Sequence, residues 1–278
     1  MYEGFYKLQA KPFQLSADPR FFFSSRSHRR AMAYLMYGVY QGEGFLVITG
    51  EIGAGKTMLA NTLALKRAAG KWVQANVVST HLRGDDMVRM VAAAYDLPQD
   101  RSKAVLLSRV EKFLLACQRQ GKRALLVVDE AQNLPARSIE ELRMLSNYVA
   151  ASKPLLQTFL LGQPELRKTL QRPEMEQLRQ RVIASCHLGP MDRADTQAYI
   201  VHRLRTVGWQ NDPSFSEDAF DGIYQHTGGI PRKINSLCDR LLLMGRLDEK
   251  HAFTGKDVAA VIDDLNEDFD AVDLRVES

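Results

Sequence analysis

One stretch of this chain has the residue types and spacing of a phosphate-binding loop. It reads Gly50-Glu51-Ile52-Gly53-Ala54-Gly55-Lys56-Thr57 and matches the pattern GxxxxGK[ST] between a predicted strand and a predicted helix. Glycines let such a loop turn tightly and point successive backbone N–H groups at a phosphate, beside the positive end of the helix. The alternative is a glycine-rich turn with a chance lysine, and the flanking strand and helix make it the weaker interpretation.

The side chains at the end of this loop predict a bound nucleotide and a metal ion. We expect Lys56 to reach the β- and γ-phosphates of ATP, and the Thr57 hydroxyl to ligate the Mg²⁺ that bridges them. The predicted contacts to ATP or ADP are the loop residues Gly50–Thr57 together with the next residue, Met58.

A second candidate site is an aliphatic run that ends in two carboxylates. The run Ala124–Glu130 reads Ala-Leu-Leu-Val-Val-Asp-Glu, which is the pattern of a Walker B strand. Asp129 is expected to hold the Mg²⁺ shell, and Glu130 to act as general base towards the attacking water. A buried strand that runs out into an acidic loop has the same pattern, but the phosphate loop upstream favours the catalytic interpretation. The second carboxylate suits hydrolysis and is not needed by a kinase.

Gln163 is a third candidate because it follows another predicted strand, Leu155–Leu161. Its amide could contact the γ-phosphate or the attacking water. An amide before Pro164 is equally typical of a turn residue, so both interpretations stay open at this point.

The composition excludes several classes of protein. Of the 278 residues, 45% are hydrophobic and 25% are charged, which excludes collagen-like, low-complexity and largely disordered chains. The longest aliphatic run, Ala124–Val128, is far shorter than the roughly 20 residues that span a bilayer. The start of the chain lacks the basic and apolar regions of a signal peptide. We therefore expect a cytoplasmic protein without a transmembrane segment, at the inner membrane only through partners.

The cysteines and the charge leave fewer clues. Cys117, Cys186 and Cys238 form no CxxC pair, so neither a disulfide framework nor a zinc site is indicated. The net charge is +4 (37 basic minus 33 acidic residues), and from Leu247 onward 3 basic and 10 acidic residues give −7, which leaves +11 for residues 1–246. A basic body suits nucleic acid, nucleotide phosphates or an acidic partner, although a solvated surface has the same composition.

The hydrophobic pattern predicts the strands and helices that would position these residues. Apolar runs alternate with segments of helical period, which predicts a parallel sheet with helices on both faces and a ligand at the carboxyl ends of the strands. The predicted strands are Phe45–Thr49, Trp72–Ser79, Ala124–Asp129, Leu155–Leu161 and Val182–Leu188. The predicted helices between them are 56–69, 84–96, 103–120, 136–150 and 164–170.

The pattern changes near Pro190. Beyond it the sequence predicts four helices with no strand between them, at Asp195–Val207, Ser216–His226, Pro231–Leu247 and Gly255–Leu265. Asp192 and Ser216 are predicted N-caps, and Gly208 and Gly228 are predicted helix ends. We therefore expect an α/β nucleotide-binding domain at 1–190, an all-helical domain at 191–266 and a frayed acidic tail at 267–278.

At this point the residues resemble a known family. The two phosphate-site motifs, Gln163–Leu166, Leu178–Val182 and the run Gly-Gly-Ile-Pro-Arg-Lys-Ile-Asn at 228–235 are together similar to AAA+ ATPases of the ExeA (general secretion pathway protein A) type. The opening residues Tyr2–Tyr6, Lys11–Phe13 and Asp18–Phe23 look closer still to the secretion ATPases of exosortase and exopolysaccharide loci. The resemblance covers roughly residues 1–266.

The resemblance implies roles that spacing alone does not. Arg181 matches an arginine finger supplied to the γ-phosphate of a neighbouring subunit, with Arg179 as second choice, and such a finger requires a homo-oligomer. Arg232 matches the sensor-2 arginine that contacts nucleotide from the helical lid, and Gln163 takes the sensor-1 position. Without the family pattern, each arginine would be interpreted as a surface charge.

The family also implies an arrangement. Its sheet order is 5-1-4-3-2, and its N-terminal segment, here residues 1–44, lies near the adenine. Phe21, Phe22 and Phe23 are expected to be core residues rather than a base-stacking platform, and the helix Arg29–Tyr40 a structural cover for the base. Long ExeA-type proteins carry a membrane segment and a peptidoglycan-binding domain after the ATPase, whereas this sequence ends in an acidic stretch, so their cell-wall role is not carried over.

The sequence thus favours a Mg²⁺-dependent, self-assembling ATPase. We expect it to drive or regulate assembly of a secretion, envelope or exopolysaccharide-export system through a protein client. The rival is an ATP-dependent DNA-binding regulator resembling transposition AAA+ ATPases, for which Lys and Arg at 29–30, 66–67, 71 and 122–123 could form a stripe. A nucleotide-binding module without hydrolysis is a weaker reading because both carboxylates are present.

Overall fold

The chain forms two compact units. In the computed structural model, one unit comprises His28–Ile52 and Lys56–Gly189, and the other comprises Met1–Ser27, Gly53–Gly55 and Pro190–Ser278. We call them the sheet unit and the helical unit.

The structure describes residues 2–16, 18–42, 44–67, 72–78 and 87–276, without side-chain detail at 64–67 and 268–276. The predicted strand end at Ser79 and the predicted helical residues 68–69 and 84–86 lie outside the described residues.

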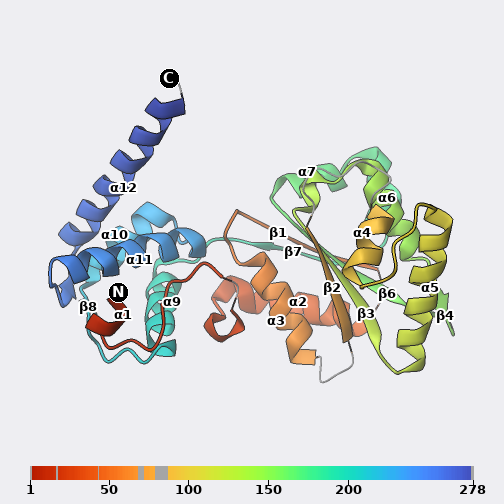
Figure 1. Cartoon of the computed structure of the whole chain (residues 1–278), viewed down its shortest axis with the longest axis horizontal. Helices are drawn as coiled ribbons and strands as arrows, with labels where there is room; N and C mark the ends of the chain where they lie inside the picture. The colour runs from red at the N-terminus through yellow and green to blue at the C-terminus, as the bar shows by residue number, and fades with distance from the viewer. Residues whose placement is uncertain (1, 17, 43, 68–71, 79–86, 277–278) are drawn as a thin grey trace. The chain divides into compact units, whose positions relative to one another are not determined.

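A five-stranded parallel sheet organises the sheet unit. Its strands are β1 (Phe45–Gly50), β2 (Trp72–Val78), β3 (Arg123–Asp129), β6 (Leu156–Gly162) and β7 (Val182–Leu188). They lie in the order β2-β3-β6-β1-β7, all parallel, which in chain order is the 5-1-4-3-2 arrangement that the resemblance implied. Figure 1 shows helices on both faces of this sheet. The α/β fold class expected from the alternating pattern is therefore confirmed.

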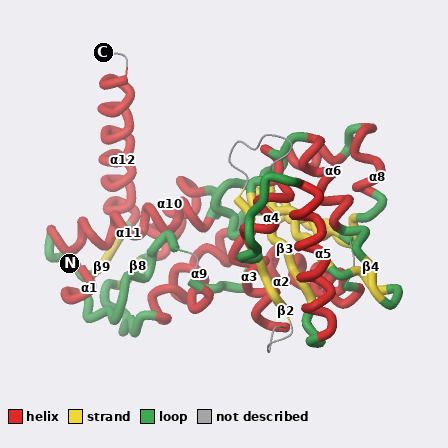
Figure 2. The backbone as a smooth tube through the Cα atoms, turned by 45° about the vertical axis from the view of Figure 1, so that its right-hand side comes forward, coloured by secondary structure: helices red, strands yellow, loops and turns green. Residues whose placement is uncertain are grey.

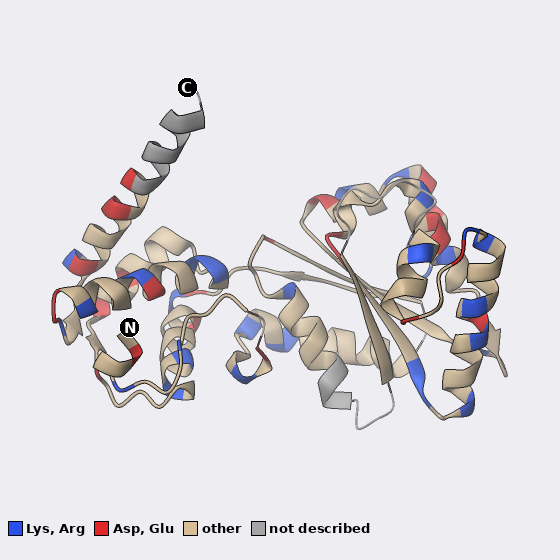
Figure 3. Ribbon diagram, viewed as in Figure 1, with Lys and Arg blue, Asp and Glu red and all other residues tan. Residues whose placement is uncertain are grey.

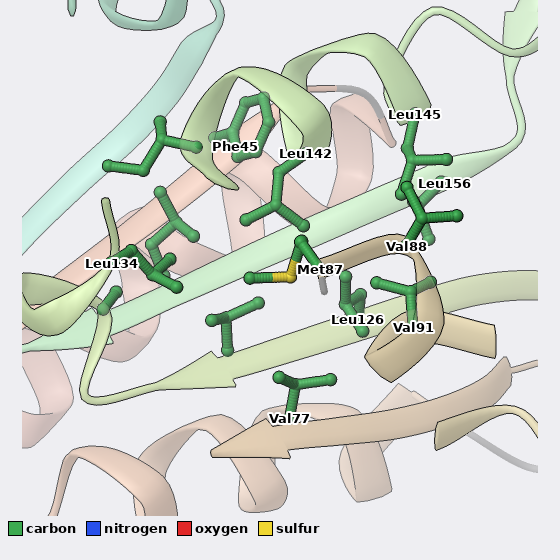
Figure 4. Packing of buried hydrophobic residues seen from close by; sticks show 14 of the residues in the cluster. Phe45, Val77, Met87, Val88, Val91, Leu126, Leu134, Leu142, Leu145 and Leu156 are labelled. Atoms are coloured by element: carbon green, nitrogen blue, oxygen red, sulfur yellow. The ribbon is translucent and has the colours of Figure 1, made fainter. Parts of the chain in front are cut away.

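Helices pack on the sheet through alternate strand residues. Phe45 and Val47 of β1 join a cluster with helices α4 (Met87–Ala94), α5 (Lys103–Arg119) and α6 (Ala136–Leu145). Figure 4 shows side chains of α4 and α6 in this cluster, and those labelled are Met87, Val88, Val91, Leu142 and Leu145. Since strand side chains alternate between faces, Leu46 points the other way.

Helix α2 (Arg26–Gln41) contacts β1 on that opposite face. A Cβ built on Gly38 would lie 2.3 Å from Leu46 Cδ2 and 3.3 Å from the Cβ of Ala184 in β7, so only glycine permits this approach. The Gly38 carbonyl also accepts a 3.0 Å hydrogen bond from Gln157 Nε2 of β6. Residues from three strands thus hold α2 against the sheet. The remaining helices of this unit are α3 (Lys56–Arg67), α7 (Glu165–Leu170) and α8 (Glu176–Arg179).

One predicted helix is shorter than expected. The segment predicted as 136–150 ends at Leu145, and Val149–Ala150 (β4) pairs with Lys153–Pro154 (β5) in a small hairpin. Its two-residue turn, Ala151-Ser152, has φ values of +49° and +59°. Such turns usually contain Asn-Gly or Asp-Gly, so Ala-Ser gave no hairpin signal in the sequence.

The helical unit consists mainly of helices, as Figure 2 shows in red. These are α1 (Tyr2–Phe5), α9 (Arg193–Thr206), α10 (Glu217–Thr227), α11 (Pro231–Leu247) and α12 (Gly255–Val276). The Asp192 side chain accepts the Asp195 N–H and thereby caps α9, Ser216 occupies the N-cap position of α10, and Gly228 ends α10 at φ +58°. These three predicted boundaries are confirmed.

The expectation of an all-helical C-terminal part is wrong in one detail. Ser214–Phe215 (β8) pairs in parallel with Ala252–Phe253 (β9), and the rings of Phe215 and Phe253 lie 5.3 Å apart. Strands of two residues are too short to show an alternating pattern. The last helix is longer than the predicted Gly255–Leu265, because α12 continues to Val276.

The first part of the N-terminal segment, Met1–Ser27, belongs to the helical unit, although the sequence placed all of residues 1–44 with the α/β domain. Its apolar side chains are buried in one cluster with α9 to α12, and they are Tyr2, Tyr6, Leu8, Phe13 and Phe21. Phe21 is thus a core residue, as expected. Among the described residues, no helix is both long and apolar enough to cross a membrane.

Candidate functional site

The phosphate loop connects β1 to α3, as its sequence pattern predicted. Gly53 and Gly55 adopt φ values of +79° and +93°, in the region that favours glycine. Ala54 is buried, whereas Glu51 and Ile52 are exposed. Met58 is half-buried in the first turn of α3, where its carbonyl accepts a 2.7 Å hydrogen bond from the Thr62 hydroxyl.

Lys56 is a buried cation at the start of α3. It is 6% exposed, and its Nζ donates to the carbonyl oxygens of Gly50 at 2.9 Å and Glu51 at 3.0 Å. Burial lowers the pKa of Lys56, and the carboxylates of Glu130, Asp129 and Glu51 oppose that effect. An ammonium has three N–H donors. Among the described residues two are used, which leaves one for an anionic ligand such as a phosphate.

Thr57 and Asp129 bring two oxygen ligands together. The Thr57 hydroxyl donates to Asp129 Oδ2 at 2.6 Å, across 72 residues of sequence. The contact forms because β3 ends at Asp129 and β1 leads into the loop at the same edge of the sheet. Hydroxyl and carboxylate oxygens are the ligands that Mg²⁺ prefers, and this ion usually takes only one or two from the protein. These two residues therefore fit the Mg²⁺ that the sequence predicted.

Glu130 and Gln163 are also brought together. Glu130 follows β3 and Gln163 follows β6, and Gln163 Nε2 donates to Glu130 Oε2 at 3.3 Å. The Glu130 backbone is left-handed, with φ +53°, and its N–H donates to Asp129 Oδ1 at 2.9 Å. Gln163 thus lies beside the candidate base and is more than a turn residue before Pro164.

Sequence reasoning missed Gln132, which joins these two groups. Its Nε2 donates to Glu130 Oε2, and its Oε1 accepts the Gln163 backbone N–H at 3.0 Å. The available signal was an amide two residues after the second carboxylate, in Asp-Glu-Ala-Gln.

Arg181 lies where the strands of the sheet begin, at the end opposite to the one that carries the phosphate loop. It directly precedes β7, and its carbonyl accepts the N–H of Phe45 at the start of β1. A six-residue strand is about 20 Å long, so the whole of β1 separates this position from the phosphate loop. Its guanidinium donates to Ser146 Oγ at 3.0 Å. The second choice, Arg179, is exposed and donates to the Leu170 carbonyl at 3.1 Å.

Arg232 lies in the first turn of α11, in the helical unit. A contact between its side chain and nucleotide stays a prediction. So does the proximity of the N-terminal segment to the adenine.

Comparisons with known proteins agree with this architecture. A family model described as AAA domain matches residues 39–170. General secretion pathway protein A of Aeromonas hydrophila is 36% identical over 261 residues, which are 93% of this chain and 47% of that protein. The chain therefore spans about half the length of this curated relative.

Solved structures share the fold at low identity. The ORC2 protein of Aeropyrum pernix, in its ADPNP-ADP complexes, has a TM-score of 0.69 at 14% identity, covering 92% of this chain and 71% of that one. Drosophila ORC bound to DNA has a TM-score of 0.66 at 16% identity, covering 90% and 63%. A RuvB variant of Thermotoga maritima has a TM-score of 0.58 at 16% identity, covering 86% and 68%. These identities establish the fold alone. The family rests on the curated relative and the AAA domain model, which show that the chain belongs to the AAA+ family and is of the general secretion pathway protein A type.

Proposed function

We propose that this chain is a Mg²⁺-dependent ATPase that assembles with itself and drives or regulates assembly of a bacterial secretion, envelope or exopolysaccharide-export system. The observation that carries the catalytic part is the convergence of Lys56, the Thr57–Asp129 pair and Glu130 at one edge of the sheet. The cellular part rests on the similarity to general secretion pathway protein A. A cytoplasmic place, at the inner membrane through protein partners, belongs to the same proposal.

Each side chain has a role in transfer of the γ-phosphoryl group to water. Lys56 offsets negative charge on the β- and γ-phosphates, because its remaining N–H is held in a buried position. Glu130 accepts a proton as water attacks phosphorus, and the Gln163 amide orients the γ-phosphate or that water. Thr57 and Asp129 would hold Mg²⁺, which supplies charge stabilisation at the phosphate oxygens.

An intersubunit finger is consistent with the position of Arg181. The position of Arg181 where the strands begin, about 20 Å from its own phosphate loop, supports a role towards a neighbouring subunit. We propose that the oligomer completes each site in this way, and that Arg232 contributes from the lid.

ATP turnover by Glu130→Gln tests the catalytic proposal. We expect kcat to fall by about 100-fold or more, because a general base contributes that much, while ATP binding persists. Glu111→Gln, an exposed residue on α5, is the matched control and should turn over at the wild-type rate. Equal rates for wild type and Glu130→Gln would contradict the role of Glu130.

Mixing two inactive variants tests the intersubunit role of Arg181. Arg181→Ala should lose about 1,000-fold in turnover, as for other arginine fingers. Mixed with Glu130→Gln subunits it should regain activity, since some sites then combine an intact Glu130 with an intact Arg181 from the neighbour. Ser146→Ala is the control: it removes the hydroxyl that accepts from Arg181 and donates to the Arg143 carbonyl, and it should keep the wild-type rate. Full activity of Arg181→Ala alone, or no recovery on mixing, would refute the finger.

DNA binding is the second candidate, favoured by the charge of +11 on residues 1–246 (+4 minus −7). Figure 3 shows Lys and Arg interleaved with Asp and Glu. Of the candidate stripe, Lys71 lies outside the described residues, and the side chains of Lys66 and Arg67 are not described. An ATP-dependent mobility shift on plain duplex at low salt would support this candidate, and its absence would count against it.

A further inference from the structure

Gln132 connects the two candidate catalytic groups, although the sequence analysis assigned it no role. We infer that Gln132 is a positioning residue: it fixes the Glu130 carboxylate and couples it to the strand end that carries Gln163. This inference rests on the proposed ATP hydrolysis.

Two hydrogen bonds define the link. Gln132 Nε2 donates to Glu130 Oε2, and the backbone N–H of Gln163 donates to Gln132 Oε1 at 3.0 Å. Gln163 Nε2 donates to the same carboxylate oxygen at 3.3 Å. The three residues therefore form a closed ring of hydrogen bonds between the ends of β3 and β6.

The Gln132 amide has only one orientation that satisfies both partners. A backbone N–H can only donate, and an ionised carboxylate can only accept. The amide must therefore turn its oxygen to Gln163 and its nitrogen to Glu130, so the network itself assigns the two atoms. A side chain of the same length with an acceptor in place of the donor would break the bond to Glu130.

The surrounding backbone holds Gln132 in this position. It lies in the 3-10 turn Ala131–Asn133, which is anchored by the buried side chains of Ala131 and Leu134. A Cβ on Gly162 would lie 2.9 Å from Gln132 Oε1 and 2.8 Å from Leu166 Cδ2, so glycine at the end of β6 makes room for the amide.

The hydrogen bonds to one oxygen of the Glu130 carboxylate leave the other oxygen available to act as the base. Among the described residues, both side-chain hydrogen bonds to the Glu130 carboxylate reach Oε2, which leaves Oε1 to take the proton from water. When the Gln163 side chain turns to a γ-phosphate, its backbone still holds Gln132. The position of the base thus stays tied to the strand end that meets the phosphate.

Two substitutions separate positioning from packing. Gln132→Met keeps the length without polar atoms, and Gln132→Glu keeps the shape but replaces the donor with an acceptor. For both we expect kcat to fall about 10- to 100-fold, because the base loses its orientation. KM and the affinity for a fluorescent non-hydrolysable ATP analogue should stay within about twofold, because Gln132 makes no contact predicted to bind nucleotide. Asn133→Ala, an exposed residue of the same turn, is the control and should match wild type.

A double-mutant cycle measures the coupling. Since the two amides serve one carboxylate, the losses in Gln132→Met and Gln163→Ala should combine to less than their product. The positioning role would be overturned if the kcat losses of the two single variants multiplied in the double variant. It would also be overturned if both Gln132 variants kept wild-type kcat, or if Asn133→Ala lost as much kcat as they do. A parallel loss of analogue affinity or of the thermal midpoint in both Gln132 variants would overturn it as well. If any of these results is obtained while Glu130→Gln is inactive, only the inference on Gln132 is refuted and the proposed hydrolysis remains supported. If wild type and Glu130→Gln turn over equally, both proposals are refuted.

Discussion

Among the residues whose side chains the structure describes, each unit has one deeply buried lysine or arginine, and the two are bonded differently. Lys56 of the sheet unit is 6% exposed and Arg203 of the helical unit is 4% exposed. Lys56 uses two of its three donors, both to backbone carbonyls of its own loop.

Arg203 uses all three of its nitrogens within the protein. It donates to the carbonyls of Pro12 and Gln14 and to the Tyr199 hydroxyl, and its guanidinium carbon lies 4.5 Å from the centre of the Phe21 ring. It therefore ties the N-terminal segment to α9. The comparison teaches that a buried cation bonded only to its own loop is available to a ligand, whereas one bonded to segments distant in sequence holds the fold.

The largest expected effect is on turnover in Lys56→Met. We expect ATP hydrolysis to fall about 1,000-fold, because one preorganised donor to the transferring phosphoryl group is lost. The free energy of unfolding should not fall, since a buried charge is removed along with only two hydrogen bonds. Steady-state kinetics and urea denaturation check the two halves. If Lys56→Met kept wild-type turnover, or if it unfolded, Lys56 would not differ from Arg203 in its role.

The next effect is on stability in Arg203→Met. We expect a loss of about 3 kcal/mol, because two carbonyls and a hydroxyl lose a charged donor in the interior. Arg205→Met, an exposed change on the same helix, is the control and should cost little. ATP-analogue affinity, measured well below the melting temperature, should be retained. A loss confined to nucleotide binding, with normal stability, would make Arg203 a site residue and overturn the comparison.

The smallest effect is on how the free energy of unfolding depends on pH, and of the two buried cations we expect it for Lys56. Burial holds the pKa of Lys56 below its usual 10.5. Between that lowered value and 10.5 the unfolded chain binds more protons, so this residue makes stability rise with pH across the window. The free energy of unfolding of wild type minus that of Lys56→Met should therefore increase from pH 7.5 to pH 10. The same difference for Arg203→Met is the comparison and should not increase with pH in this way. Equal slopes of the two differences against pH would contradict the assignment.

Local rules predicted the sheet and much of the site. Strand and helix periods placed Lys56 and Thr57 after one strand and Asp129 at the end of another, and parallel pairing brings such ends to one edge. The 2.6 Å contact between Thr57 and Asp129 is the result. The strand order came from family resemblance, since periodicity does not specify which strands are neighbours.

What escaped prediction depends on contacts distant in sequence. Arg203 interacts with residues almost 190 positions away, so no window of sequence links it to Pro12. Gln132 gained its role only when β3 and β6 became neighbours. The pairing of Phe215 with Phe253 likewise needs the folded chain.

The left-handed backbone of Glu130 has a consequence for the evolution of this type of protein. Such a conformation costs an ordinary side chain about 1 kcal/mol, but is easily adopted by Gly and Asn. The proposed role of Glu130 as general base would keep a glutamate here against that preference. In a lineage that no longer needs turnover, the first changes at this position should be to Gly or Asn, since each relieves the strain. Descendants that only bind nucleotide would then be recognisable from this one position.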